Sequence, residues 1–460
     1  FALNYHIRRL CSYKIMSVRT VVCLLTLLFV AVGSPASAQT VKALVGGTLI
    51  DGYGGAPIHD SVVLVEGEDI VEVGREQAID IPKDAEVIST EGMTVMPGLW
   101  ESHAHLMLVG HSDYSHWHSR YTGAALSDTI MPAAAEQLLH AGVTSARDLG
   151  APLEEILEVQ NRIQAGEIPG PTLYVTGPFL QNEPYPGTEA YRWGIDSPEE
   201  ARRKVRHLDS AGVDIIKMVD QDKMGMDAVR ALVDEAHQRN LSVVAHAHRP
   251  EEIRRGLQVG VDNFEHTGLG TAPAYSDDIM QKLKEATAQR QLYWTPTISP
   301  LLLYEQTRDN PERIDSPDWH RGLPDAVVSD VQQSLENPRR LSYYQMMPQR
   351  NRTLDTKFQQ LQESGVNLLV GTDSGVPLNF QSDATWRELD YWVNRFGVDP
   401  MEALRAATYW PAVMMGVENE YGTIEPGKKA DIIAVRGNLL RHISLLQDVD
   451  LVLKHGERVK

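Results

Sequence analysis

Two histidines separated by one residue, His103 and His105, close an apolar stretch and could bind a metal ion. On a β-strand, side chains at positions i and i+2 point to the same face, so both imidazoles can hold one ion from one side. The Pro97-Gly98 pair before them indicates an irregular start to that strand. A single His-x-His pair also occurs on protein surfaces and in cores, so this pair alone does not define a site.

Four more residues with metal-site chemistry follow in chain order, each at the end of a short β-like run: Lys217, His246, His266 and Asp373. Imidazole nitrogens and carboxylate oxygens suit zinc and similar ions, and a catalytic site must leave one coordination position for water. Both cysteines, Cys11 and Cys23, precede the cleavage site predicted below. The mature chain must therefore hold any metal through nitrogen and oxygen atoms.

This ordered set of residues resembles the amidohydrolase superfamily, in the branch whose two metal ions are bridged by a carboxylated lysine. The resemblance runs from about Val41 to the C-terminus. Within the superfamily the chain is similar to imidazolonepropionase-like and prolidase-like members and to ochratoxin-cleaving amidases. The segments that carry this similarity are Pro97-Gly98-Leu99, Ala141 to Gly150, Ile168-Pro169-Gly170-Pro171 and Glu425 to Asp431.

The resemblance implies two divalent metal ions, for which we expect zinc. It assigns His103, His105 and Asp373 to the first ion, and His246 and His266 to the second. The ions would share a hydroxide, and Asp373 would carry its proton to the departing nitrogen.

Lys217 would bridge both ions as a carbamate, an N6-carboxylysine. An ammonium cannot bind a cation, and the alternative reading of Lys217 is a salt bridge or a surface lysine. The preceding Ile215-Ile216 favours a buried amine, whose pKa burial lowers toward the neutral, reactive form.

The implied activity is hydrolysis of an amide bond, in a dipeptide or an N-acyl amino acid. Alternatives of the same class are a carbamate, a cyclic amide, a lactone or a mycotoxin amide. A metal-free binding or scaffolding protein on the same fold is an alternative of another class. A protein of that kind would have lost some of the metal-binding residues, whereas all six are present in this sequence.

Three residues are weaker candidates for substrate contacts. His248 lies two residues after His246 and should face the same side, although a surface position fits nearly as well. Arg249 could hold a substrate carboxylate or face solvent, and Tyr293 could line the pocket or pack in the core. For the histidines of the loop after the first strand, His111, His116 and His118, we expect a solvated loop, with an adventitious role or one at the pocket rim as the alternative.

Strand-like runs alternate with helical ones across the middle of the chain, which is typical of βα units around a parallel sheet. The eight candidate strands are those at His103 and His105, Val143 to Arg147, Thr172 to Thr176, Asp214 to Lys217, Val243 to His246, Asn263 to His266, Leu292 to Thr297 and Asn367 to Asp373. These predict an α/β fold, a (β/α)8 TIM barrel, whose active site lies where strands end. Every candidate ligand falls there.

Short alternating runs at both ends of the chain predict a small β-sandwich domain that the N- and C-terminal segments form together. We expect residues 39–95 with 416–460 to form it, and residues 96–415 to form the barrel. The interval 299–354 is longer than one βα connection, and we expect a helical insertion there. It would lie near the pocket mouth or pack on a neighbouring subunit.

Residues 1–38 are interpreted as upstream sequence and a secretory signal peptide. Arg19 precedes an uncharged run of 12 residues, and Ala36-Ser37-Ala38 has the form of a cleavage site. We therefore expect cleavage after Ala38 and a secreted or periplasmic protein. The sequence upstream of Met16 would precede the true start.

The remaining chain is strongly acidic, with 39 basic and 62 acidic residues and a formal charge of -23. This charge disfavours nucleic acids and anionic membranes as partners. We expect a small-molecule or dipeptide substrate, no membrane association after cleavage, and a homo-oligomer.

Overall fold

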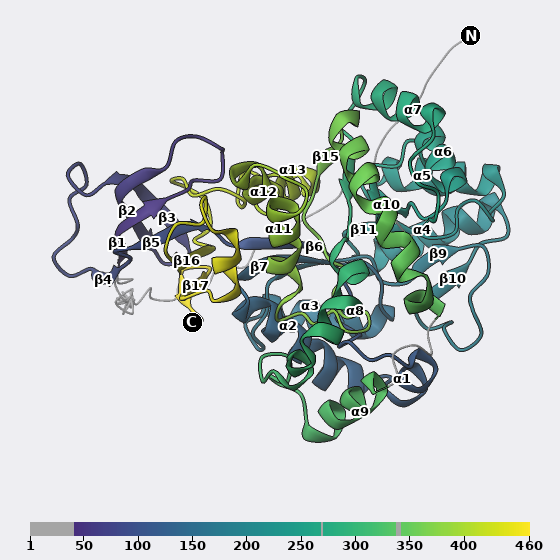
Figure 1. The fold of residues 1–460 in the computed structure, drawn as a ribbon, viewed down its shortest axis with the longest axis horizontal. Helices are drawn as coiled ribbons and strands as arrows, with labels where there is room; N and C mark the ends of the chain where they lie inside the picture. Colours follow the sequence, from purple (N-terminus) through teal and green to yellow (C-terminus); the bar gives the residue numbers. More distant parts are fainter. Residues whose placement is uncertain (1–40, 268–269, 337–341) are drawn as a thin grey trace, which may run out of the picture. The chain divides into compact units, whose positions relative to one another are not determined.

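The computed structural model describes residues 41–267, 270–336 and 342–460 (Figure 1). Residues Thr40–Lys460 form one compact unit. The predicted signal peptide and its cleavage site lie outside the described residues. In the described part of the chain, no helix is both long and apolar enough to cross a membrane.

The barrel contains all eight predicted strands, and its parallel ladders run in chain order. Their bounds are β6 Leu99–Ala104, β7 Val143–Asp148, β8 Thr172–Val175, β11 Ile215–Met218, β12 Ser242–His246, β13 Asn263–Glu265, β14 Tyr293–Thr295 and β15 Asn367–Leu368. Most of these residues are buried, as expected for strands covered on both faces. The predicted fold class is confirmed.

Single hydrogen bonds close the ring where the ladders stop. The Asp214 N–H donates to the Val175 carbonyl at 2.9 Å, which joins β11 to β8. On the other side, the chain after β15 runs beside β6, where the Ser102 N–H donates to the Val370 carbonyl at 3.0 Å. The His105 N–H donates to the Ser374 carbonyl at 2.9 Å. The first and last barrel strands therefore meet beside two of the candidate ligands.

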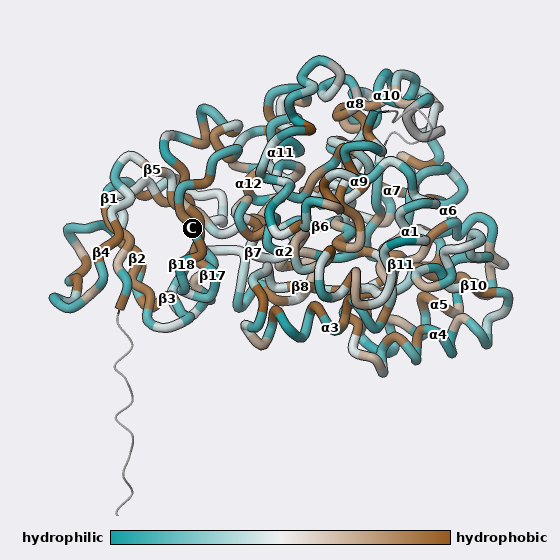
Figure 2. The backbone as a smooth tube through the Cα atoms, turned by 90° about the horizontal axis from the view of Figure 1, so that it is seen from below, coloured by the Kyte–Doolittle hydropathy of each residue, from teal (hydrophilic) through white to brown (hydrophobic). Residues whose placement is uncertain are grey.

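The covering helices are amphipathic, and α4 (Pro198–Ala211) shows how the sequence forms one. The Ser197 hydroxyl caps its first turn by accepting from the Glu200 N–H, and Gly212 ends it in a left-handed conformation. Ala201, Val205 and Leu208 recur at helical spacing and are buried. Along α3 and α4 hydrophobic and hydrophilic stretches alternate in Figure 2.

Further helices lie between the barrel strands and after the last of them. They are α1 Tyr114–Arg120, η1 Leu126–Ile130, α2 Met131–His140, α3 Leu153–Gln164, α5 Met226–Gln238, α6 Pro250–Val259, α7 Asp277–Thr287, α11 Ala384–Asn394, α12 Pro400–Ala406 and α13 Tyr409–Met415.

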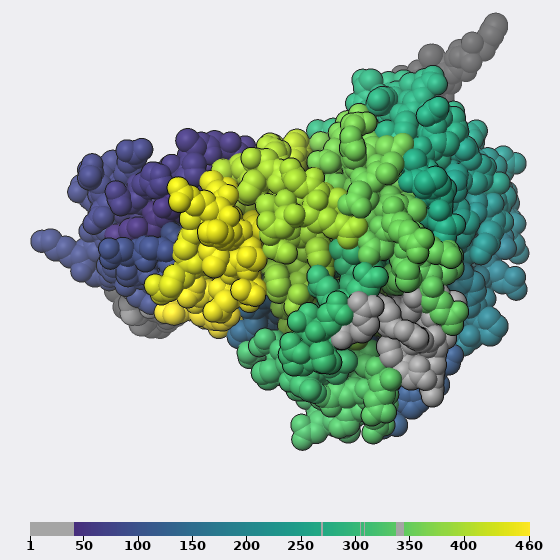
Figure 3. All heavy atoms as spheres, in the orientation of Figure 1, coloured from purple at the N-terminus to yellow at the C-terminus, as the bar shows by residue number. Residues whose placement is uncertain are grey.

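Both ends of the chain contribute to one eight-stranded sheet. Its strands are β1 Lys42–Leu49, β2 Ile58–Glu66, β3 Asp69–Arg75, β4 Glu86–Ser89, β5 Met93–Pro97, β16 Ile432–Arg436, β17 Leu451–Lys454 and β18 Glu457–Arg458, with η4 (Ile443–Gln447) before β17. The antiparallel pairing of β5 with β16 joins the two ends. Figure 3 shows this C-terminal segment in yellow beside the N-terminal strands in purple.

In the described part of the interval between β14 and β15 lie four helical elements: α8 Ser299–Asp309, η2 Pro311–Asp315, α9 Asp325–Leu335 and α10 Ser342–Ser364. The buried carboxylate of Glu388, in α11, accepts from the N–H groups of Ile298 and Ser299 at 2.9 and 2.7 Å. This pair of bonds fixes the start of α8 directly after the barrel strand β14.

A two-stranded ribbon after β8 is a feature that sequence analysis did not predict. It consists of β9 (Phe179–Gln181) and β10 (Arg192–Gly194), which pair in parallel. β9 also pairs with the barrel strand β11 through Leu180 and Met218. The ribbon thus extends the barrel sheet at the strand ends where the candidate ligands lie.

Candidate active site

His103 lies fully buried near the end of β6, and its ring orientation is fixed by a carboxylate. The distance from its Nδ1 to Glu265 Oε2 is 2.7 Å. The other Glu265 oxygen accepts from Arg147 Nη2 at 3.1 Å. A carboxylate paired with arginine accepts the Nδ1 proton, so the Nε2 lone pair of His103 remains available to a ligand.

His105 has the same tautomer for a simpler reason. Its Nδ1 lies 3.3 Å from the Gly150 carbonyl, which can only accept, so Nδ1 carries the proton. His105 Nε2 then presents its lone pair to Asp373 Oδ1 at 3.2 Å, and His103 Nε2 lies 3.5 Å from the same oxygen. Two lone pairs and a carboxylate oxygen thus converge, which is unfavourable without a cation among them.

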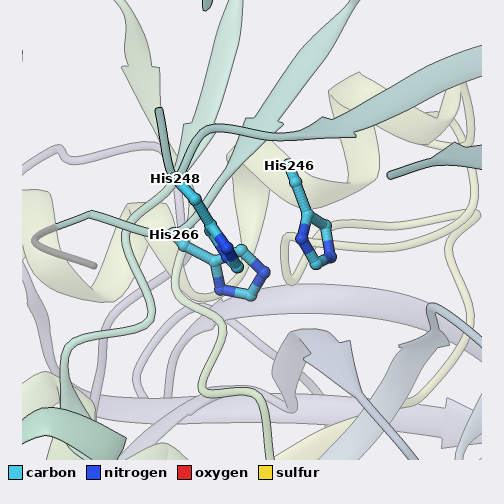
Figure 4. Close-up of side chains that lie close together, drawn as sticks. All are labelled: His246, His248 and His266. Atoms are coloured by element: carbon cyan, nitrogen blue, oxygen red, sulfur yellow. The ribbon is translucent and has the colours of Figure 1, made fainter. Parts of the chain in front are cut away.

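Three more imidazoles gather at the ends of β12 and β13 (Figure 4): those of His246, His248 and His266. The ring centroid of His246 lies 4.5 Å from that of His248 and 4.5 Å from that of His266. His266 Nδ1 lies 2.9 Å from the Thr297 hydroxyl, which fixes that ring in turn.

Lys217 points into the same region from β11, and its side chain is completely buried. Among the described residues its Nζ has no hydrogen-bond partner. Burial lowers the pKa of this amine to about 8, although Glu265 and Asp373 favour its charged form. The amine is therefore partly neutral near physiological pH, as a reactive lysine must be.

The site can be tested against a metal by counting its unsatisfied nitrogens. Five buried nitrogen atoms of this site lack a hydrogen-bond partner among the described residues, namely His103 Nε2, Lys217 Nζ, His246 Nδ1, His248 Nε2 and His266 Nε2. Each unsatisfied buried group costs about 1–3 kcal/mol, so together they would rival the stability of a domain. A cation that accepts these lone pairs would remove most of that cost, and the residues therefore fit a metal site.

Burial also sets the protonation state that a metal requires. It lowers the pKa of His103, His246 and His266 well below the ordinary value, and that of His248 to about 3. All four rings are neutral at physiological pH and keep a lone pair. Two groups of three have ligand atoms within 4.8 Å of one another, and they share His266: His246 with His248 and His266, and His103 with His266 and Asp373.

A buried carboxylate, Glu101, aligns the two strands that carry the first histidines and Asp373. It accepts from the His103 N–H at 3.0 Å and from the Thr372 N–H at 2.8 Å. The hydroxyls of Thr372 and Thr385 donate to its second oxygen at 2.9 and 2.7 Å. Gly371 allows this approach, since a Cβ there would lie 2.8 Å from the His103 nitrogen.

Three site residues other than glycine adopt left-handed backbone conformations. His266 has φ 75°, Asp373 has φ 58° and Thr297 has φ 47°. Such conformations cost about 1–3 kcal/mol each and persist only where the surroundings impose them. Their clustering at three consecutive strand ends is a further sign of a functional site.

A cavity of about 350 Å³ opens onto these groups. His105, His246, His248, His266 and Asp373 form its floor, and its walls are mostly apolar or aromatic. The wall residues are Met107, Leu108, Tyr114, His118, Phe179, Tyr191, Arg192, Val376 and Pro377. A concave apolar pocket with a few convergent polar groups is the usual form of a small-molecule site.

A model of the amidohydrolase family matches residues 94–459 of the chain. The chain belongs to the amidohydrolase family. Ochratoxinase from Aspergillus niger is 25% identical, and the match covers 91% of this chain and 87% of that protein. Imidazolonepropionase from Geobacillus kaustophilus is 27% identical over 82% of this chain and 84% of its own length.

The barrel of this amidohydrolase also resembles solved structures. A Bifidobacterium longum protein regarded as a prolidase has a TM-score of 0.69 and 30% identity, and the match covers 92% of this chain and 95% of that one. The predicted resemblance to this superfamily is thereby confirmed, and the protein is a hydrolase of this family. Members of the family generally use divalent metals, for which the histidine and aspartate clusters are suited.

The structure brings together all six residues that sequence analysis placed around a metal, along with His248. It places two other candidates elsewhere. Arg249 caps α6 and pairs with Asp220, Asp222 and Glu252 at 2.6 to 2.8 Å. These carboxylates neutralise its positive charge. Tyr293 is buried in the barrel among apolar residues such as Leu149 and Ile215. The predicted substrate contacts of Arg249 and Tyr293 are therefore corrected.

The loop histidines are a further correction. The prediction of a solvated loop is wrong for His111, which is 1% exposed and packs against Trp117. His118 lines the cavity, in agreement with the alternative of a role at the pocket rim. His116, with 42% of its side chain exposed, matches the solvated loop.

Proposed function

We propose that this chain is a binuclear metal-dependent amidohydrolase that hydrolyses an amide bond in a dipeptide or an N-acyl amino acid. The observation that carries the proposal is the convergence of two imidazole lone pairs on one oxygen of Asp373, at 3.2 and 3.5 Å. A cation among these atoms turns a repulsive contact into coordination.

In this proposal His103, His105 and Asp373 hold one ion, and His246 and His266 hold the other. Lys217 lies between them as a carbamate, which is supported by its buried, unpartnered amine. We propose zinc because the donors are imidazole and carboxylate groups. When bound, the two ions supply Lewis acidity and lower the pKa of a water molecule.

Asp373 is proposed as the proton carrier. Its carboxylate is 14% exposed and lines the cavity, so it can reach both substrate and solvent. It takes a proton from the attacking water as the new C–O bond forms. It then passes that proton to the nitrogen as the C–N bond breaks.

The substrate class is supported by the pocket and by the relatives together. A cavity of about 350 Å³ suits a molecule of dipeptide size. Two relatives bear the names ochratoxinase and prolidase. The sequence also resembles enzymes that cleave dipeptides and N-acyl amino acids. Both similarities favour an amide as the substrate over another carbonyl compound.

A library of dipeptides and N-acyl amino acids, each with free and amidated C-termini, tests this function on zinc-loaded protein. We expect amide cleavage that a chelator abolishes and zinc restores. With both ions bound but neither set cleaved, carbamates, cyclic amides and lactones would replace amides as candidate substrates. A site that stays empty after purification with zinc would favour a binding protein on the same fold.

Glu265→Gln tests the carboxylate that orients His103. Loss of this partner typically costs about 10- to 100-fold in metal affinity, because the imidazole loses both its orientation and part of its basicity. The same decrease is expected here, measured by zinc competition with a chromophoric chelator.

Glu252→Gln is the matched control, since Glu252 is equally buried and also pairs with an arginine, at 2.8 Å, but contacts no proposed ligand. Its zinc affinity should stay within about twofold of the wild type. Equal losses in both variants would show that general destabilisation, not orientation of His103, lowers the affinity.

A further inference from the structure

Arg192 differs from the other arginines around the active site in having no acidic partner. It is the one lysine or arginine among the described residues that line the cavity. Arg147 and Arg249 both pair with carboxylates, at 3.1 and 2.6 Å. No carboxylate within residues 41–267, 270–336 and 342–460 forms an ion pair with Arg192.

Aromatic rings hold this guanidinium in place without cancelling its charge. Its Cζ lies 4.8 Å from the ring centroid of Phe179, 4.8 Å from that of Tyr185 and 5.4 Å from that of Tyr191. Nη1 donates to Gln181 Oε1 at 2.8 Å, while the buried Nε finds no hydrogen-bond partner in the part of the chain that the structure describes. Arginine in such a setting keeps donors for an anion, and its planar fork matches a carboxylate.

Phe179 connects this cation to the proposed reaction centre. One face of the ring carries Arg192, and the ring centroid lies 5.8 Å from that of His105 and 6.5 Å from that of His246. Arg192 and the two imidazoles therefore lie around one aromatic ring in the wall of a single cavity, which also opens onto Asp373. A ligand in this cavity can meet the guanidinium and the proposed metal ligands together.

We propose that Arg192 anchors the free carboxylate of the amino acid that leaves, and that the ribbon β9–β10 builds this subsite. The proposal rests on the proposed amide hydrolysis and assigns the substrate class more narrowly. The remaining wall is apolar, from Met107, Leu108, Val376 and Pro377. The preferred leaving group is therefore an α-amino acid with an uncharged, apolar or aromatic side chain and an unblocked carboxylate.

The test compares N-acetyl-L-phenylalanine with its C-terminal amide as substrates of the zinc-loaded enzyme. We expect Arg192→Gln to lower kcat/KM for the acid about 10- to 100-fold, mainly through KM, because charge-assisted hydrogen bonds are lost. The amide should change less than about twofold, and Arg192→Lys should recover part of the loss for the acid. Arg203→Gln, at an exposed position of α4, is the control and should change neither.

Calorimetry separates failure of this anchor from failure of the proposed hydrolysis. L-Phenylalanine and L-phenylalaninamide are titrated into the same proteins, with no turnover required. Binding of the acid that depends on Arg192 supports the anchor even if no amide is cleaved. Hydrolysis with equal losses for acid and amide, or acid binding that Arg192→Gln leaves unchanged, overturns the anchor. Absence of binding by the acid to the wild type also overturns it.

Discussion

Asp373→Asn is expected to lower kcat by about 10³-fold or more while leaving the fold intact. The amide has the same shape as the carboxylate but cannot accept the proton of the attacking water. The substitution also removes a negative charge from the proposed metal site, where two imidazole nitrogens lie 3.2 and 3.5 Å from one carboxylate oxygen, and should weaken metal binding. Steady-state kinetics and metal analysis by mass spectrometry measure the two effects separately.

Asp330→Asn provides the matched control for this substitution. Asp330 has a similar exposure, 16% of its side chain against 14% for Asp373, and also lies close to a histidine nitrogen, 3.1 Å from His116 Nε2. It lies outside the cavity wall, so kcat should stay within about threefold of the wild type. If Asp373→Asn kept a tenth of the activity with full metal content, the proton would have to travel through another group.

Lys217→Met is expected to remove most of the bound metal and to lower activity by about 10³-fold, since the proposed bridging carbamate cannot form. Methionine fits the buried volume and carries no amine. The metal-free variant should be at least as stable as the metal-free wild type, because a buried, unpartnered amine is removed. Thermal unfolding of both metal-free proteins measures this, and a marked loss of stability would instead favour a structural ion pair.

Lys357→Met is the control for burial of a lysine. Burial also lowers the pKa of Lys357 to about 8, but its Nζ donates to the Gly270 carbonyl at 2.8 Å, away from the proposed ligands. Metal content and activity should survive this change. If both lysine variants lost metal equally, the loss could not be attributed to a bridging group.

The same lysine gives the metal-free protein a characteristic pH dependence. Only the neutral amine reacts with carbon dioxide, and the pKa of Lys217 is lowered to about 8. Below that value the neutral fraction falls about tenfold per pH unit, so reactivation with zinc at a fixed concentration of dissolved carbon dioxide should slow by about that factor from pH 7 to pH 6. The folded-state pKa lies below the unfolded one, so the stability cost of this amine is present below pH 8 and is lost as the pH rises.

The barrel strands, and the face of a strand on which each candidate ligand lies, could be predicted from the sequence because both depend on local patterns. Apolar runs define the strands, and the period of two places His103 and His105 on one face. Polar residues at the ends of parallel strands gather at one edge, which is why Lys217, His246 and Asp373 could be placed together.

The contacts that complete the pocket depend on tertiary structure and have no local signal. Glu265 reaches His103 across 162 residues of sequence. Arg192 enters the cavity only because an irregular segment forms the ribbon β9–β10. Arg249 was a candidate for the substrate carboxylate, whereas the structure pairs it with Glu252, three residues later, at the start of α6.

The carboxylate of Glu101 also has a consequence for the order in which the protein forms. It accepts from Thr372, 271 residues later in the sequence, at the seam where the first barrel strand meets the last. Contacts this distant form late, since a long loop must close first. On the proposed metal site, a growing chain would carry its histidines as separate, weak sites until synthesis had passed Asp373. Closure of the seam would then be the step that assembles the full ligand set.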